Sequence, residues 1–383
     1  MFIFTLPQIK WLPIYELRSR VERRIDPDFS SAIGDNQTRW DNRLRAGTDF
    51  SSGKNVTGQL RYQYSHSTFW RPTLNNSDDN SDLLLGNISY KQGKSTWTVG
   101  RQMITKGDRR LIDVSDYSQR PKVFDAVRFR LGRFDGFAGK VGMTSDITDY
   151  SKISMASYQT SLGETMAVYK LNDKIGTNVW TLDQRYAKTQ GKLKYQIEGA
   201  LQQGKSTGKG HKAWFSNARV EYAQSKNTTL YTEANVASGG VTNNEQHLFD
   251  PLYGTGHTPY GLMDVQGLRN MRHLEIGVQQ KLTTDLSSKL SFNGYGLYDP
   301  ADGWYSNGGG INRRPGGRIV DPTGQSGRDV GNEINLAFAW TPNKRDTVNF
   351  ELGVFTPGNF VKKVVGPAAT RQVWGLLSYQ AKF

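Results

Sequence analysis

Arginines at alternate positions are the residues of this chain whose type and spacing best suit them to chemistry. Arg18 and Arg20 lie two residues apart, and Arg43 and Arg45 repeat the spacing. A guanidinium group keeps its charge and presents a planar fork of donors that fits a carboxylate or a phosphate. A row of such groups predicts a surface that binds or guides anions.

Other motifs give little support for catalysis or cofactor binding. Residues 199–206 (GALQQGKS) fit the phosphate-loop pattern, but that loop needs a helix after it, and the segment alternates like a strand. The acidic stretch 75–82 (NNSDDNSD) falls in a predicted loop and lacks calcium-loop spacing. The five histidines are scattered and cysteine is absent. We therefore expect no enzyme, no metal site and no cofactor.

The period of two also indicates which element carries the arginines. In residues 14–25 (IYELRSRVERRI) the charged residues alternate with Tyr15, Leu17 and Val21, and successive side chains of a strand point to opposite faces. The chain has no run of about 18 apolar residues that a transmembrane helix would need. Other segments show the same two faces, with an apolar side that we assign to lipid (Leu193, Ile197, Phe350 and Leu352) and a polar side such as Gln196.

The connections between these segments alternate in length. Tight turns at one end alternate with long polar stretches at about 66–82, 104–122, 239–271 and 299–330. Bacterial outer-membrane barrels have short periplasmic turns and long extracellular loops. The sequence therefore predicts an all-β, transmembrane antiparallel β-barrel of about 18 strands. Sixteen is the fallback, because SLGET could be a bulge between 153–160 and 165–171.

A single barrel accounts for residues 14–383, and residues 1–13 are set apart as a leader, an expression remnant or a periplasmic N-terminal segment. The chain ends in LLSYQAKF, and an aromatic residue at the end of an alternating strand is typical of bacterial outer-membrane proteins. A soluble propeller or sandwich is the alternative. No repeat of about 40 to 50 residues supports a propeller.

The net charge of +14 comes from 49 basic and 35 acidic residues. Many arginines on a barrel wall pair with acids on neighbouring strands, but the excess must remain unpaired. Unpaired arginines around a pore attract anions and repel cations. Basic residues at the outer rim are also suited to lipopolysaccharide, and no role for nucleic acid is expected.

Two stretches resemble bacterial alginate export porins. Residues 99–132 carry a Gly-Arg-Gln strand end, a loop and a P-x-x-FDAVR re-entry, and residues 247–278 carry a Tyr-Gly-x-Met-Asp core. The resemblance implies an 18-stranded outer-membrane channel for an anionic polysaccharide, with an arginine-rich constriction and long gating loops. The best-matched pore positions are Arg101, Arg128 and Arg130, which could converge beside a loop that holds Arg109 and Arg110.

Together these features predict an anion-selective outer-membrane channel that exports an acidic polysaccharide such as alginate. The alternatives are an uptake porin for small anionic or aromatic nutrients, and an outer-membrane barrel enzyme or adhesin. The expected partners are the anionic polysaccharide or small anions, outer-membrane lipid and lipopolysaccharide, and periplasmic polysaccharide-export components. Arg18, Arg20, Arg43 and Arg45 are assigned to the pore by alternation alone.

Overall fold

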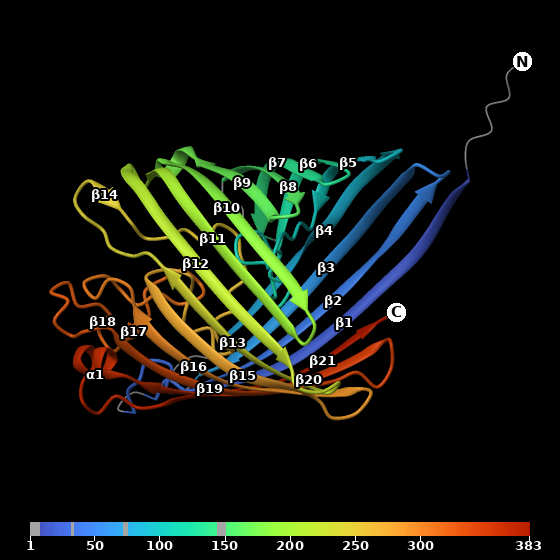
Figure 1. Ribbon diagram of the computed structural model, residues 1–383. Helices are drawn as coiled ribbons and strands as arrows, with labels where there is room; N and C mark the ends of the chain where they lie inside the picture. The colour runs from blue at the N-terminus through green and yellow to red at the C-terminus, as the bar shows by residue number, and fades with distance from the viewer. Residues whose placement is uncertain (1–7, 32–33, 72–75, 144–150) are drawn as a thin grey trace, which may run out of the picture.

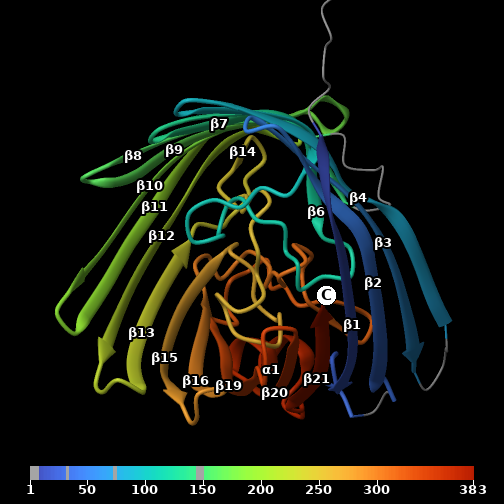
Figure 2. The same ribbon diagram turned by 90° about the vertical axis from the view of Figure 1, so that its right-hand side faces the viewer.

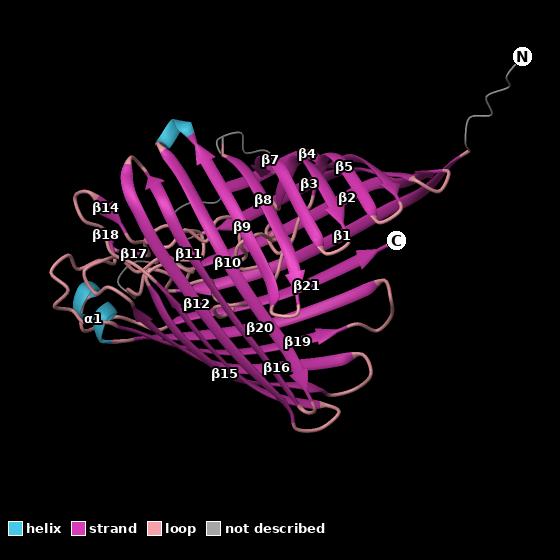
Figure 3. Ribbon diagram, turned by 45° about the horizontal axis from the view of Figure 1, so that its top comes forward, coloured by secondary structure: helices cyan, strands magenta, loops and turns pink. Residues whose placement is uncertain are grey.

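The computed structural model describes residues 8–31, 34–71, 76–143 and 151–383, and it is a closed β-barrel (Figure 1). Eighteen long strands in these residues form one antiparallel sheet, and the last strand pairs with the first to close it. Strands dominate Figure 3, where helix is confined to two short pieces. The predicted fold class is confirmed.

The wall strands are β1 (Ile9–Ile25), β2 (Gln37–Ser52), β3 (Val56–Trp70), β4 (Asn76–Gln92), β5 (Ser95–Gln102), β6 (Lys122–Leu131), β7 (Phe134–Met143), β8 (Lys152–Thr160), β9 (Gly163–Asn172), β10 (Thr177–Gln190), β11 (Leu193–Ser206), β12 (Lys209–Ala223), β13 (Thr228–Ala237), β15 (Met271–Lys281), β16 (Leu286–Leu297), β19 (Asp329–Trp340), β20 (Asp346–Pro357) and β21 (Gln372–Lys382). The loops contain β14 (Glu245–Gln246), β17 (Arg313–Arg314), β18 (Gly317–Arg318), η1 (Asp173–Ile175) and α1 (Asn359–Val365). No helix in the described segments is long and apolar enough to cross a membrane. Because β8 and β9 are separate paired strands, the count is eighteen and the sixteen-strand fallback is wrong.

The alternation of faces follows the prediction. On β1, Val21 is exposed on the outside, whereas Arg18 and Arg20 are buried on the inside. On β11, Ile197 is exposed and its neighbour Gln196 is buried. Leu193, Phe350 and Leu352 are also exposed, as expected for side chains that face lipid. The apolar outer face and the polar lumen are therefore arranged as the sequence indicates.

β1 begins at Ile9, inside the segment 1–13 that the sequence sets apart. Ile9 pairs with Ser52 of β2, so residues 9–13 form part of the wall. Trp11 and Leu12 are both exposed, and no charged residue stands between them and Tyr15. Residues 9–13 therefore lack the alternation of polar and apolar residues, and the sequence pattern predicts a start of this strand only at residue 14.

Three of the four predicted long connections are confirmed, and we name them L3 (residues 103–121), L7 (238–270) and L8 (298–328). The fourth, at 66–82, is wrong because β3 continues to Trp70 and β4 begins at Asn76. The acidic stretch therefore lies mainly in a strand, where ion pairs hold its carboxylates. Asp78 pairs with Arg120 of L3, and Asp79 with His66 of β3. Two connections at the loop end, 173–176 and 207–208, are short.

The segment GALQQGKS lies within β11, which pairs with β10 on one side and β12 on the other. Both sides of the segment are therefore occupied by the barrel ladder. A phosphate loop needs free backbone amides at the start of a helix, and no helix follows here. The rejection of this motif is confirmed.

The largest apolar cores lie inside the barrel, where loops fill the lumen. Figure 2 looks along the barrel and shows L3, in cyan, and L7, in yellow to orange, between the walls. Ile112 of L3 and Phe249 of L7 are fully buried in one cluster with Phe124 of β6. The loops also share backbone hydrogen bonds, since the Tyr253 amide donates to the Leu111 carbonyl at 2.9 Å. L3 and L7 are thus one packed unit inside the wall.

Candidate functional site

Four arginines on β1 and β2 hold one end of L3. Arg18 stands directly opposite Arg43, and Arg45 lies opposite Glu16. Arg18 and Arg43 both donate to the backbone carbonyls of Asp116 and Ser118, at 2.9 to 3.3 Å. Arg45 donates to the Asp116 carboxylate, and Arg20 donates to the Tyr117 carbonyl at 3.0 Å. We call this set, Arg18, Arg20, Arg43 and Arg45 with residues 116–119, the arginine clamp.

The arginine clamp carries more positive than negative charge. Within the described residues its neighbourhood brings together six arginines and four carboxylates: Arg18, Arg20, Arg24, Arg39, Arg43 and Arg45 with Glu16, Glu22, Asp41 and Asp116. Arg18 forms no salt bridge with any described residue and donates only to neutral oxygens, including Gln119 Oε1 at 2.7 Å. Arg43 and Arg45 outweigh the effect of burial and lower the pKa of Asp116 below its usual range. The surplus charge is therefore centred on Arg18.

The opposite wall, formed by β10 to β13, is acidic, and L3 meets it with cations. Arg110 is 2% exposed and donates to Glu233 of β13 at 2.6 Å. Its guanidinium also lies 3.7 Å from Glu198 of β11 and 3.2 Å from the Tyr260 hydroxyl of L7. L3 thus presents a carboxylate to the basic wall and a guanidinium to the acidic wall.

L7 is fixed to the arginine clamp through aromatic rings. The His257 ring stacks on Tyr117 of L3, with 3.4 Å between ring centroids and 13° between planes. The Arg20 guanidinium lies 4.5 Å from the centroid of the same tyrosine. Burial lowers the pKa of His257, but the carboxylates of Asp264 and Glu351 outweigh it and raise that pKa to about 9. At neutral pH the imidazolium therefore ties L7 to L3 and to β20.

A cavity of about 320 Å³ lies between L3 and strands β1, β20 and β21. Its lining includes three arginines (Arg18, Arg20 and Arg109), three carboxylates (Asp113, Asp116 and Glu351) and neutral polar residues such as Ser378. Arg109 is largely exposed and lies 3.6 Å from Asp113. The arrangement can bind a carboxylate or a phosphate by charge-assisted hydrogen bonds. No group of His, Cys, Asp and Glu side chains suited to a metal ion occurs in the described segments.

The predicted convergence of Arg101, Arg128 and Arg130 on one constriction is wrong. Arg101 pairs across strands with Asp125, which lies between the buried residues Phe124 and Ala126. The register therefore places Arg101 on the outer face, where it donates to Asp125 at 2.8 Å.

The other two matched arginines, Arg128 and Arg130, lie on β6 and do not belong to the arginine clamp. Arg128 points inward and is bound to Asp135 of β7 at 2.6 Å, so it is a wall salt bridge. Arg130 lies near the turn end of β6, in a groove with Lys54 and Lys91. The four arginines assigned by alternation alone are the ones that the fold gathers around L3.

The sequence also missed the neutral and aromatic members of the site. Tyr117 and Gln119 lie in L3 without any periodic pattern, and His257 lies within a matched motif that gave it no role. Their positions depend on how two loops pack inside the barrel. Asp116 offered a signal, because it is an acid within the long connection 104–122 and the resemblance implies long gating loops.

Comparisons with known proteins agree with this architecture. A family model described as "Alginate export" matches residues 140–374. No curated protein matches the chain. Among solved structures, the chain is similar to Pseudomonas aeruginosa OccK5 (OpdH), with 12% identity, a TM-score of 0.63 and 98% of each chain covered.

Two further similar structures contain small acids. Pseudomonas aeruginosa OccK2 (OpdF) in complex with glucuronate has 11% identity, a TM-score of 0.64 and 98% coverage of each chain. Pseudomonas aeruginosa OpdK with vanillate has 11% identity and a TM-score of 0.64, with 98% of this chain and 99% of that chain covered. At these identities the likeness shows the fold alone.

Proposed function

The chain belongs to the alginate export family of outer-membrane barrels, and on that premise we propose that it is an anion-selective channel for carboxylated solutes. The observation that carries the proposal is the surplus of arginine at the arginine clamp, with Arg18 both unmatched by a carboxylate and on the cavity wall. At about 6 Å, an arginine attracts a carboxylate by roughly 1–3 kcal/mol for effective dielectric constants of about 20 to 80. Such an attraction favours anions and still lets them leave.

The dimensions of the site favour a small solute. With L3 and L7 in place, the cavity beside the arginine clamp measures about 320 Å³, which suits one uronate or one aromatic acid. The OpdF structure with glucuronate and the OpdK structure with vanillate are barrels of the same fold that bind acids of this size. Uptake of small carboxylated nutrients is therefore the function that the geometry supports best.

Export of an acidic polysaccharide such as alginate is the second candidate, and family membership favours it. A polymer needs a continuous bore, so L3 and L7 would have to separate from the wall. The contact between Tyr117 and His257 is the junction that has to open. Periplasmic polysaccharide-export components are expected as partners only in this case. Neither candidate requires catalysis.

Liposome swelling with purified protein tests the proposal and separates the two candidates. We expect glucuronate to enter faster than uncharged glucose, and Arg18→Gln to reduce that preference. An oligouronate of several residues should not enter the wild-type channel if the loops stay in place. Equal rates for glucuronate and glucose would contradict the anion channel, whereas rapid entry of the oligouronate would favour the polymer.

A further inference from the structure

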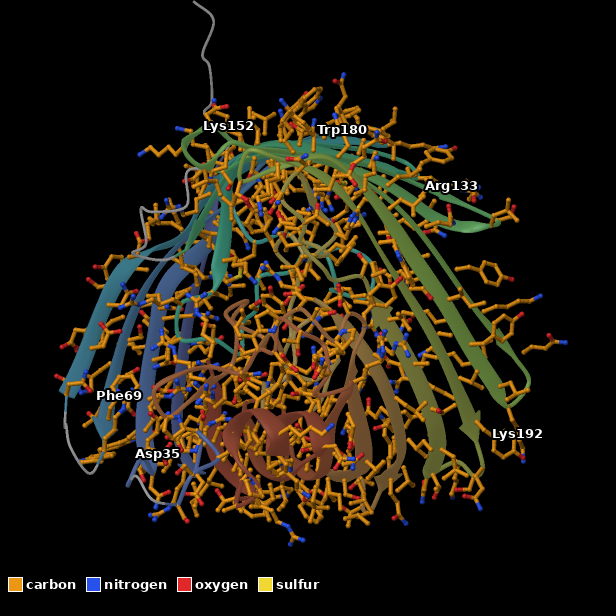
Figure 4. All side chains as sticks on the ribbon, turned by 90° about the vertical axis from the view of Figure 1, so that its left-hand side faces the viewer. Asp35, Phe69, Arg133, Lys152, Trp180 and Lys192 are labelled. Atoms are coloured by element: carbon orange, nitrogen blue, oxygen red, sulfur yellow. The ribbon has the colours of Figure 1, made fainter. Side chains whose placement is uncertain are left out.

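Two lysines lie directly opposite each other on the outer face of the barrel, at the extracellular end of the wall. Lys140 of β7 and Lys152 of β8 are cross-strand partners, and both are exposed. Their neighbours Val141 and Ile153 are buried, so both lysines point away from the lumen. Figure 4 shows Lys152 on the outside of the wall. Like charges in this relation are destabilising.

Among the residues that the structure describes, the neighbouring acids compensate this pair only in part. Asp125 is the cross-strand partner of Lys140 on the other side, but it is bound to Arg101 through two hydrogen bonds of 2.8 and 2.9 Å. Asp173 lies 3.7 Å from Lys152, and both side chains are more than half exposed, so water weakens that attraction. Within the described ranges, Lys140 forms no ion pair.

An aromatic pair marks the depth of these lysines in the membrane. Tyr169 of β9 and Trp180 of β10 are outward-facing cross-strand partners, and their ring centroids lie 4.6 Å apart. Tyr169 pairs with Ser154, two residues along β8 from Lys152. Figure 4 labels Trp180 and Lys152 along the same upper, outer side of the wall. Tyrosine and tryptophan rings on a barrel exterior lie at headgroup level, so the lysines lie at the polar edge of the outer leaflet.

From this geometry we propose that Lys140 and Lys152 bind a phosphate of lipid A, the anchor of lipopolysaccharide. The extracellular end of an outer-membrane barrel faces a leaflet built from this lipid. Three acceptor oxygens of a phosphate monoester can receive hydrogen bonds from two ammonium groups at once, and the added negative charge removes the repulsion between them. The aromatic pair packs against the adjoining acyl chain and sugar.

A second cation fits the second phosphate of the same lipid. Lys205 of β11 is exposed on the outer face and lies across from Asn178 of β10. It is three strands away from Lys152, roughly 14 Å at the usual strand spacing. The site is independent of the transported solute, because all three lysines lie outside the lumen.

Native mass spectrometry of the purified protein in detergent, titrated with lipid A, tests the site. We expect lipid A with both phosphates to bind at least about tenfold more tightly than the dephosphorylated form at low salt, and the difference to shrink near 1 M salt, where the Debye length is about 3 Å. Lys140→Gln/Lys152→Gln should reduce this phosphate preference severalfold, and adding Lys205→Gln should remove it. Lys140→Arg/Lys152→Arg should retain it.

The matched control is Lys188→Gln/Lys192→Gln, at the turn end of β10 and β11, where Figure 4 places Lys192 far from Lys152. This control should bind lipid A like the wild type. The variant Lys140→Gln/Lys152→Gln should also leave glucuronate entry unchanged. A failure of the lipid A proposal can therefore be distinguished from a failure of the channel proposal. An undiminished phosphate preference in that variant, or an equal loss in the control, would overturn the site.

Discussion

The basic wall of β1 and β2 and the acidic wall of β10 to β13 bind opposite ends of the same loop, but they are not equivalent. On the acidic side, the single guanidinium of Arg110 is held by three carboxylates, those of Glu233, Glu198 and Asp108. On the basic side, Arg18 has only neutral acceptors. The acidic wall anchors L3 through salt bridges to Arg110, whereas the basic wall keeps an arginine without a carboxylate partner that can attract a solute. The number of arginines matters less than which of them lack a carboxylate.

The largest expected effect is on the acidic wall. Arg110→Gln should lower the free energy of unfolding by about 3–5 kcal/mol, because it removes the guanidinium beside buried Glu198 and leaves Glu233 with Arg219 alone. Arg18→Gln should cost less than half of this, since it also relieves repulsion from Arg43. Denaturant unfolding in detergent measures both. Equal losses of unfolding free energy in the two variants would show that both walls anchor L3 to the same extent.

The double variant Arg110→Gln/Glu233→Gln sharpens that comparison. With both charges removed, the loss should be smaller than the sum of the two single losses, as expected for groups in direct contact. Additive losses would mean that the pair is not coupled, and the anchoring role of the acidic wall would then be wrong.

An arginine introduced on the acidic wall should change the free energy of unfolding little, whereas one introduced on the lipid-facing side should lower it. Leu352→Arg should cost roughly 2–4 kcal/mol if the residue lies near the bilayer midplane. Gln196→Arg should be mild, because Gln196 faces the lumen and already bonds to the Asp108 carboxylate. Refolding into lipid vesicles measures the difference. Similar costs at both positions would mean that the inner and outer faces are exchanged.

The junction between L7 and L3 should weaken at alkaline pH. The pKa of His257 is raised from an ordinary 6.5 to about 9 by Asp264 and Glu351, while Tyr117 and Trp374 pack against its ring. Because the folded pKa is higher than the unfolded one, the stabilisation is complete below about pH 6.5 and is lost as pH rises through 9. At most about 3 kcal/mol is involved, at 1.36 kcal/mol per pKa unit.

Hydrogen exchange of residues 255–265, corrected for intrinsic rates, measures this effect. Exchange in the wild type should accelerate between pH 7 and 10. His257→Gln should exchange faster at pH 7 and show little further change. If that variant kept the wild-type pH dependence, another group would have to be responsible.

The barrel could be predicted from sequence because lipid contact imposes one rule on every strand. Ile197 and Gln196 follow that rule, and so do Val21 and Arg20. Applied to residues 95–103, the same rule puts Arg101 on the side of the exposed Val99, whereas the resemblance implied a pore position for it. Where the alternation and a carried-over motif disagreed, the physical pattern was right.

The loop interior could not be predicted in the same way. The stacking of Tyr117 on His257 joins residues 140 positions apart, with no local pattern to indicate it. The acidic residues around Asp78 predict a loop, but they lie in a strand because Arg120 of L3 balances the charge of Asp78. Contacts of this kind depend on tertiary packing, which a single sequence does not reveal.

The zero-current potential of single channels in a KCl gradient tests the central claim most directly. The wild type should prefer chloride, Arg18→Gln should reduce that preference at low salt, and Arg101→Gln, on the outer face, should leave it unchanged. The difference in anion preference should shrink in molar salt, where the Debye length is about 3 Å and charges are strongly screened. If Arg18→Gln keeps the full anion preference, or if Arg101→Gln loses it equally, the unmatched arginine of the basic wall does not set the selectivity.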